Sequence, residues 1–380
     1  MGLFDFLKKK ETKGTASAHS NDISEKKENV GTTMLSNEQM GSDGIIPFEE
    51  RIKSAIPSKN GLYPHEILVL DYADSFCTQD NRYQQFWWTR YGVKDVNKVL
   101  RDLLSKGFIS IASVDVTLRK MTIADLKAIL AKYGLSTRGK KEELIQRVID
   151  EISSEKLKEL FPNRFYIRTD RGEAELREEE YVPYIHRHSI QNLDIWSLNR
   201  LVNDSPDDAY KDVIWQYLNQ QSIEFFKAKK YGSFRGCRCS MAEILGEEGR
   251  TVEELEMLAE IAFYDLSGAK DNYNPEILHF IALHFFPYEH SSVRIASGIV
   301  GRIFRCQEKM GLTDIALKEI LVNCMRELFT PIQIFSVDEC ADIVFYEHAG
   351  DMEALKSLYD IAEKKFYRDH PDLKKVSYEN

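Results

Sequence analysis

The sequence predicts a mainly α-helical protein with a small β component, and three observations support this prediction. Apolar residues recur at helical spacing over much of the chain, and Gly or Pro separates the successive patterns. Only two short runs have the composition of strands, Phe108–Ile111 and Phe165–Arg168. The 380 residues are 43% hydrophobic and 11% aromatic, which is ample for buried cores.

A first folded domain is expected from residue 45 to 190, after a polar segment at 1–44 that has the composition of a disordered tail. Tyr63–Ala73 has proline at a helix start and continues with helical apolar spacing. Asp95–Lys106 repeats the helical pattern, and Gly107 ends it. The two predicted strands then enclose a further helical segment, at 119–152.

This segment contains two short helical patterns joined at Gly134-Leu135. Thr122 is placed to cap the first helix, with Asp125 as its partner three residues on, and Gly134 ends it because glycine readily adopts a positive φ. Each helix has one apolar face, formed by Ile123, Leu126, Ile129, Leu130 and Tyr133 in the first and by Leu144, Ile145, Val148, Ile149 and Ile152 in the second.

The hairpin is basic, although the protein is acidic. From Arg119 to Asp150 there are eight Lys or Arg against four Asp or Glu, a net charge of +4, whereas the whole chain carries −10. Such a surface suits phosphate, because each neutralised phosphate releases condensed counterions. Arg138–Lys141 also begin the second helix, where free N–H groups and the helix dipole favour an anion. The alternatives are a merely solvated helical face or a surface that docks a protein.

The spacing of the hairpin resembles the SAP domain, a helix-extended-helix nucleic-acid-binding module. The residues that match are Leu126, Leu130, Gly134, Leu135, Thr137, Gly139, Lys140, Lys141, Leu144 and Arg147. The resemblance implies that Arg138, Lys140 and Lys141 bind backbone phosphate. The full set of candidate nucleic-acid-binding residues is Lys127, Lys132, Thr137, Arg138, Gly139, Lys140, Lys141 and Arg147.

The order of elements around the hairpin resembles the winged-helix group. Two helices, Leu-Leu-x-x-Gly-Phe-Ile, a second strand and Thr-x-x-Gly-x-x-x-Leu follow one another, and the hairpin at 119–152 would be inserted between the two strands of the wing, where a surface turn tolerates insertion. A helical brace that presents the hairpin is the alternative.

Over most of its length the chain also resembles uncharacterised SAP-domain-containing proteins of Gram-positive bacteria and their phages. The supporting blocks are Leu68–Ala73, Trp88–Gly92, Leu103–Ile109, Thr169–Gly172, Tyr181–His188 and Ile261–Gly268.

The region 191–380 is expected to be an all-helical interaction domain. Its last two helices are separated by Ala349-Gly350-Asp351 and resemble a tetratricopeptide-type hairpin, which would offer a surface for a protein partner. An ordinary helical bundle is the alternative. The candidate helices are Val252–Tyr264, Pro275–Phe286, Val293–Met310, Asp314–Phe329, Val337–His348 and Met352–Phe366.

We find no motif for catalysis or for a metal or cofactor site. A glycine-rich phosphate loop, a nucleophile elbow and His-Glu-x-x-His are all missing from the sequence. His186-x-His188, whose side chains would share a face on a strand, and Cys237-x-Cys239 each supply two ligands where a zinc site needs three or four, so packing is the preferred interpretation. Asp360–Lys365 places acids beside lysine on a helix, which leaves a SAP-containing nuclease as a minor alternative.

We expect a cytoplasmic protein with no stable membrane insertion. Six scattered cysteines favour reduced thiols, and no run approaches the roughly 18 apolar residues of a membrane-spanning helix. Residues 1–10 combine Leu3, Phe4, Phe6 and Leu7 with lysines, which allows at most a transient membrane contact.

Taken together, these features of the sequence predict a non-enzymatic adaptor that binds DNA, or else RNA, through the hairpin. A protein-interaction scaffold without nucleic-acid binding is the alternative.

Overall fold

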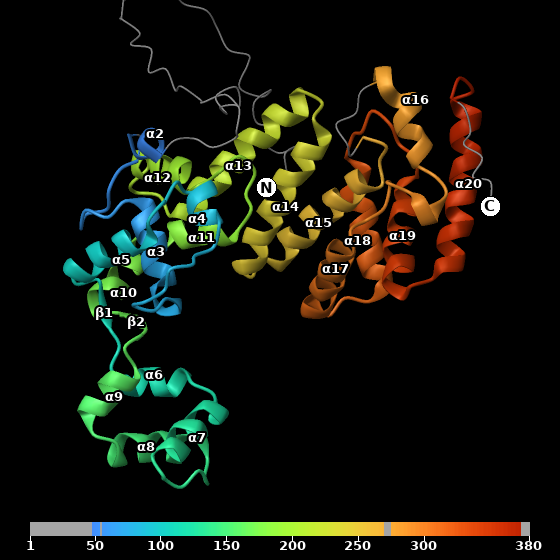
Figure 1. Cartoon of the computed structure of the whole chain (residues 1–380). Helices are drawn as coiled ribbons and strands as arrows, with labels where there is room; N and C mark the ends of the chain where they lie inside the picture. Colours follow the sequence, from blue (N-terminus) through green and yellow to red (C-terminus); the bar gives the residue numbers. More distant parts are fainter. Residues whose placement is uncertain (1–47, 54, 270–274, 374–380) are drawn as a thin grey trace, which may run out of the picture. The chain divides into compact units, whose positions relative to one another are not determined.

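The computed structural model describes residues 48–53, 55–269 and 275–373, so the expected tail at 1–44 lies outside the described residues. The described chain divides into two compact units that meet in sequence at Tyr210 and Lys211. Both are mainly helical, and a two-stranded sheet is the only sheet in the described residues (Figure 1). The predicted fold class, mainly helical with a small β component, is therefore confirmed.

Helix α3 (Pro64–Tyr72) is the centre of the amino-terminal unit. It is apolar on nearly every side and is buried from Pro64 to Leu70 except at Glu66, as expected of a helix that packs against neighbours all round. Proline starts it with a helical φ, and the Tyr63 amide donates to Glu66 Oε2 over 2.8 Å. The helices that pack on it are α5 (Val96–Ser105), α10 (Asp170–Glu178), α11 (Tyr181–Arg187) and α12 (Ile195–Asp204). Short elements α2 (Phe48–Lys53), η2 (Ala73–Ser75) and α4 (Phe86–Thr89) complete the unit outside the inserted segment.

Helix α12, which the sequence analysis placed with the carboxy-terminal domain, lies in this unit. Its Trp196 ring is 5.5 Å from the ring of buried His65 in α3. Its Asn199 accepts a hydrogen bond from the Ile56 amide (2.7 Å) and donates one to the Ile56 carbonyl (3.0 Å). These contacts join segments far apart in sequence.

The two predicted strands are present and pair with each other. β1 (Ile109–Ile111) and β2 (Tyr166–Arg168) are antiparallel, with Ile109 opposite Arg168. The Ala112 amide donates to the Phe165 carbonyl over 2.8 Å, and Phe165 also bridges to Cys77. The chain therefore leaves the unit along β1 and returns along β2 at the same place. We call this two-stranded pair the stalk.

His186 and His188 do not lie on a strand, because His186 belongs to helix α11 and His188 is its carboxy-terminal cap. Val182 and Ile185, three residues apart, both point into the core, as helical spacing requires. His186 bridges two phenol groups, with Nε2 2.7 Å from Tyr72 Oη and Nδ1 2.6 Å from Tyr91 Oη. Burial, followed by the nearby arginines, lowers the pKa of His186. The two histidines do not act as a pair.

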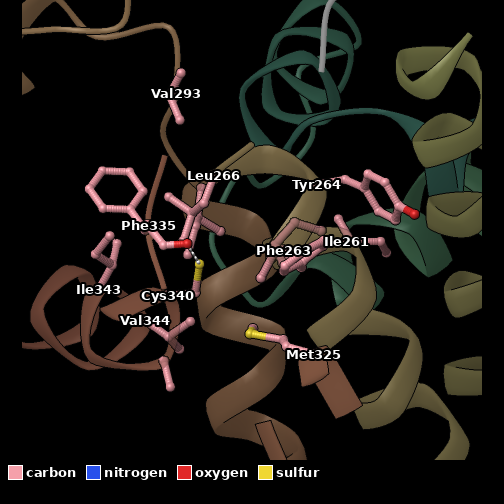
Figure 2. Close-up of a cluster of buried hydrophobic side chains, with 14 of the residues drawn as sticks. Ile261, Phe263, Tyr264, Leu266, Val293, Met325, Phe335, Cys340, Ile343 and Val344 are labelled. Carbon is pink, nitrogen blue, oxygen red and sulfur yellow. Dashed lines mark hydrogen bonds between the residues drawn. The ribbon is translucent and has the colours of Figure 1, made fainter. Parts of the chain in front are cut away.

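The carboxy-terminal unit is built around helix α15 (Thr251–Asp265), which packs against α14, α17, α18 and α19. Figure 2 shows part of this core, where Phe263 and Leu266 lie among Met325, Phe335 and Val344 in one buried cluster. The remaining helices of the unit are α13 (Tyr210–Lys227), α14 (Tyr231–Glu247), η3 (Pro275–Ile277), α16 (Leu278–Ile281), η4 (Ala282–His284), η5 (Tyr288–His290), α17 (Ser297–Met310), α18 (Asp314–Arg326), α19 (Val337–Ala349) and α20 (Met352–Asp369).

Most of the helices predicted in this unit are present, with shifted ends. The predicted helix from Pro275 to Phe286 is instead divided into the short helices η3, α16 and η4, and α17 begins at Ser297 rather than at Val293. The hairpin of α19 and α20 has the expected break. Gly350 adopts the left-handed conformation (φ 67°), and Asp351 Oδ1 caps α20 by accepting from the Ala354 amide over 3.0 Å.

Buried ion pairs hold α15 to its neighbours. Arg235 of α14 binds Asp265 through two hydrogen bonds of 2.8 Å, and the Asp265 side chain is fully buried. Arg302 of α17 binds Glu254 over 2.7 Å. Each of these carboxylates is largely removed from water, and an arginine lies against it as its partner.

We predict that Arg235→Ala destabilises the carboxy-terminal unit by about 3–5 kcal/mol, because Asp265 would remain buried and unpaired. Lys318→Ala is the control, since the Lys318–Asp342 pair is partly exposed and is expected to contribute less than about 1 kcal/mol. Urea unfolding of both variants measures the difference. Similar losses in the two variants would contradict the prediction.

Candidate nucleic-acid interface

The segment between the strands of the stalk is a small module with its own core. It consists of α6 (Val114–Lys120), α7 (Ile123–Lys132), α8 (Lys141–Glu151) and α9 (Ser154–Leu160), which follow from the ends of β1 and β2 (Figure 1). The sequence analysis identified α7 and α8 and missed α6 and α9, each of which is a seven-residue helix. The buried core residues are Leu118, Leu126, Leu130, Leu144, Ile145, Val148, Ile152, Leu157 and Phe161.

The predicted helix boundaries of the hairpin are confirmed by its hydrogen bonds. Thr122 Oγ1 accepts from the Asp125 amide over 3.2 Å, and Asp125 Oδ2 accepts from the Thr122 amide over 3.3 Å, which is the expected capping box. Gly134 follows α7 with φ 69°. The prediction for Ile123 is wrong, because this side chain is 45% exposed and does not enter the core. It is the first residue of α7.

Gly139 determines how the chain enters α8. Its φ of 129° is strained for any residue with a side chain, and a Cβ at this position would collide with Oε2 of Glu143 and lie 3.2 Å from its Cβ. Glu143 is there because its carboxylate accepts the Lys140 amide over 3.2 Å. Glycine at position 139 is therefore required by the backbone, independently of any ligand, whereas position 140 contributes only its amide to this turn.

Arg147, predicted to flank bound phosphate, has a structural role in the described contacts. It is half-buried, and one terminal nitrogen donates to the Ser136 carbonyl (2.6 Å) and to the Arg138 carbonyl (2.9 Å). It thereby fixes the loop that connects α7 to α8 and carries Thr137, itself half-buried. Since backbone carbonyls in a loop need donors, this contact stabilises the loop and orients Arg138.

Two other basic residues of the module also have partners. Arg119 binds Asp115 over 3.1 Å and Glu142 over 3.0 Å, and so ties α6 to α8. The hydrogen bonds to Asp115, followed by the charges of both acids, raise the pKa of Arg119. Lys120 donates to the Asp74 carbonyl over 2.6 Å and lies 4.0 Å from the centre of the Phe165 ring, at the end of the stalk.

The other five cations of the candidate site have no acidic partner. Within the residues that the structure describes, no carboxylate lies within 4.0 Å of the charged group of any of them. Four are exposed and Lys141 is half-exposed. Their positive charge is thus uncompensated inside the protein. The five residues, which we call the free cations, are Lys127, Lys132, Arg138, Lys140 and Lys141.

The amino terminus of α8 is less open to an anion than the sequence suggested. The Lys140 amide is already bonded to Glu143, so it is not available to a phosphate, and Glu142 and Glu143 both lie in the first turn. These carboxylates use the favourable end of the helix dipole themselves. At this end of α8 the exposed positive groups are therefore side chains, and the Lys140 amide is not among the free donors.

No three His, Cys, Asp or Glu side chains are grouped as a metal site requires, among the residues that the structure describes. Cys237 is buried, and burial raises the pKa of its thiol to about 11. Asp360–Lys365 lies on α20, in agreement with the helix predicted there. Within the described part of the chain, no helix has both the length and the apolar character needed to cross a membrane.

Comparison with family models gives one match, to the SAP domain, at residues 117–152. These residues form a SAP domain. The matched range begins inside α6 and ends at the residue that follows α8, so α9 lies beyond it although Leu157 and Phe161 complete the core. A search of curated proteins and a search of solved structures found no match to the chain. SAP domains are in general DNA- or RNA-binding modules.

We predict that Arg147→Ala loosens the loop of the SAP domain, because the carbonyls of Ser136 and Arg138 lose their donor. Hydrogen–deuterium exchange should speed up in residues 135–141. Lys132→Ala, which removes an exposed cation without a partner, serves as the control and should leave exchange unchanged. Unchanged exchange in the Arg147 variant would show that the loop does not need this arginine.

Proposed function

We propose that the protein is a nucleic-acid-binding adaptor whose SAP domain binds the phosphate backbone, with DNA as the preferred ligand over RNA. The observation that carries the proposal is the separation of the module's basic residues into two groups. Among the basic residues from Arg119 to Arg147, Arg119 and Arg147 hold the module together and Lys120 ties it to the body, whereas the free cations have no acidic partner in the described residues. Positive charges without acidic partners repel one another in the folded module, and bound phosphate would reduce this repulsion.

Arg138, Lys140 and Lys141 are the central phosphate contacts in this proposal, with Lys127 and Lys132 of α7 beside them. Arg138 is suited to a bidentate contact with one phosphate, and the lysines act as point charges. Gly139 and Thr137 contribute by shaping the loop, and Arg147 by fixing it. The module brings no exposed aromatic ring to the site, since Tyr133 is half-buried and Phe161 is buried.

The carboxy-terminal unit is proposed to hold a protein partner. Residues 211–380 contain 20 Lys or Arg and 28 Asp or Glu, a net charge of −8, which disfavours nucleic acid there. Antiparallel helices joined by short turns, such as α19 and α20, support a tetratricopeptide-like arrangement. The adaptor would then join nucleic acid at one unit to a protein at the other. We place such a protein in the cytoplasm.

A winged-helix-like body for the amino-terminal unit is also part of the proposal. Its support is the chain order: helix α3, the bridging segment at Cys77, helices α4 and α5, and then β1 and β2. The SAP domain would occupy the tip of the wing. The stalk allows this, because antiparallel strands bring the two ends of an insertion together.

We predict that Arg138→Ala, Lys140→Ala and Lys141→Ala together abolish salt-sensitive binding to labelled duplex DNA in fluorescence anisotropy. For wild type, three to six phosphate contacts give a slope of log K against log salt of roughly −3 to −5. The control variant, used again below, replaces three exposed cations of the carboxy-terminal unit: Lys227→Gln, Arg305→Gln and Lys309→Gln.

Single-stranded DNA and RNA probes rank the ligands in the same experiment. Binding by wild type and control but not by the triple variant supports the site. Failure of folded wild type to bind any probe would refute the proposed function, and the alternative of a protein scaffold would take its place.

We predict that Glu142→Gln tightens binding about 2–5-fold at low salt, because Arg119 loses one of its two acidic partners and gains a share in phosphate binding. Glu151→Gln, at the opposite end of α8, removes the same charge without releasing an arginine. The same anisotropy assay compares them. An equal gain in both variants would mean that only net charge matters.

A further inference from the structure

One tryptophan on the amino-terminal body, in the short helix α4, is exposed to solvent. All four tryptophans of the chain are among the described residues: Trp87 and Trp196 are buried and Trp215 is half-buried, whereas Trp88 is 47% exposed. Two consecutive side chains on a helix point about 100° apart, so burial of Trp87 directs Trp88 toward solvent. The SAP domain has no exposed aromatic ring in the described residues, so Trp88 is a binding group of a different kind.

The contacts around α4 hold Trp88 in a fixed place. The Trp87 ring centre lies 4.7 Å from that of Phe86, and Trp87 Nε1 donates to Gln84 Oε1 over 3.1 Å. Gly92 then turns the chain with a φ of 70°, and its amide donates to the Trp88 carbonyl over 3.1 Å. A ligand that stacks on the Trp88 ring therefore meets a side chain whose backbone is already ordered.

The chain around Trp88 is positively charged. Residues 81–94 contain three cations and no acidic residue, in a protein whose net charge is −10. Arg90 lies two residues after Trp88, and the hydrogen bond from Gly92 returns the chain to Trp88 two residues before Lys94. Arg90 and Lys94 are both exposed, and neither has an acidic partner among the described residues. Two uncompensated cations thus lie next to the exposed ring.

The acids at the two ends of this stretch are already engaged by other groups. Asp80 Oδ2 accepts from the Cys77 amide over 2.7 Å. Asp95 Oδ1 caps α5 by accepting from the Lys98 amide over 2.9 Å, and Asp95 also lies 3.6 Å from Arg101. These acids therefore leave the charge beside Trp88 available to an external anion.

We propose that Trp88, Arg90 and Lys94 bind single-stranded nucleic acid, with the Trp88 ring stacked on an unpaired base and the two cations on its phosphates. The inference goes beyond the function proposed for the SAP domain and does not rest on it. A base inside a duplex is covered on both faces by its neighbours, so a surface ring stacks only on an unpaired base. The ring alone would also suit a protein partner, but cations without acidic partners favour phosphate.

The test uses the full chain and single strands of about 15 thymidines or uridines, which is within the site sizes of single-strand-binding proteins. Anisotropy of a labelled strand measures affinity, and quenching of tryptophan emission by an unlabelled strand reports stacking. Trp88→Ala should weaken binding on the order of tenfold, whereas Trp88→Phe should keep most of the affinity and lose the quenching. Phe329→Ala removes another exposed aromatic ring and is the control. Circular dichroism verifies the fold of each variant.

Two further variants separate this site from the SAP domain. Arg90→Gln combined with Lys94→Gln should flatten the salt slope for the single strand by about 1, and the control variant with three replaced cations of the carboxy-terminal unit should match wild type. The triple variant of the SAP domain should still show quenching by the single strand. The stronger of the thymidine and uridine strands identifies DNA or RNA as the preferred ligand.

Single-strand binding by Trp88→Ala that equals binding by the Phe329→Ala control would overturn the inference. Loss of quenching in the triple variant would do the same, because the single strand would then belong to the SAP domain. Failure of folded wild type to bind either strand would also overturn it and would favour a protein partner for Trp88. Duplex binding by the same samples tests the SAP domain separately, so its persistence would leave the proposed function intact.

Discussion

The pairing of β1 with β2 is the constraint on which the organisation of the amino-terminal unit depends. Ile109 lies opposite Arg168, so the chain can leave the body, form four helices and return without disturbing the helices that surround α3. Arg168 secures the returning strand. Its side chain binds Glu173 (2.7 Å) and Asp74 (3.0 Å), and its amide donates to Asp74 over 3.1 Å. A binding module is thereby joined to a folded body through a few backbone hydrogen bonds.

Within the SAP domain, some basic residues have fixed partners and others have none in the described residues. Arg119 and Arg147 are used to join helices and to close the loop, and both are engaged by fixed acceptors. The free cations lie at the surface, four of them exposed and Lys141 half-exposed, so their charged groups stay in contact with solvent. Arginine suits the first role because its planar group can meet several acceptors at once. A count of basic residues alone does not distinguish the two roles.

The central helices of the two units are buried by different kinds of interaction. α3 is buried because it is apolar on nearly all sides, whereas α15 carries buried acids and needs arginines from α14 and α17. Buried ion pairs add little net stability compared with apolar contacts, but they penalise every packing that separates the partners. We interpret the pairs on α15 as fixing which neighbours this helix accepts.

The local signals in the sequence determined a good part of this protein. Thr122 with Asp125, Gly134 and the apolar periodicity fixed α7 and α8, and the strand pair with its insertion followed from Phe108–Ile111 and Phe165–Arg168. These features depend on residues close together in the chain, so capping and periodicity suffice to predict them. Gly139-Lys140 and Leu144-x-x-Arg147 likewise indicated the SAP domain from the sequence alone.

The tertiary structure alone decided the roles that depend on distant partners. It made Arg147 a support of the loop, gave the Lys140 amide to Glu143, and turned His186 into a bridge between Tyr72 and Tyr91. It also gathered α6 and α9 onto the hairpin, since seven-residue helices carry too weak a period to be recognised in isolation. Spacing along the chain specifies which face a side chain occupies, but its partner is set by the folding of other segments against it.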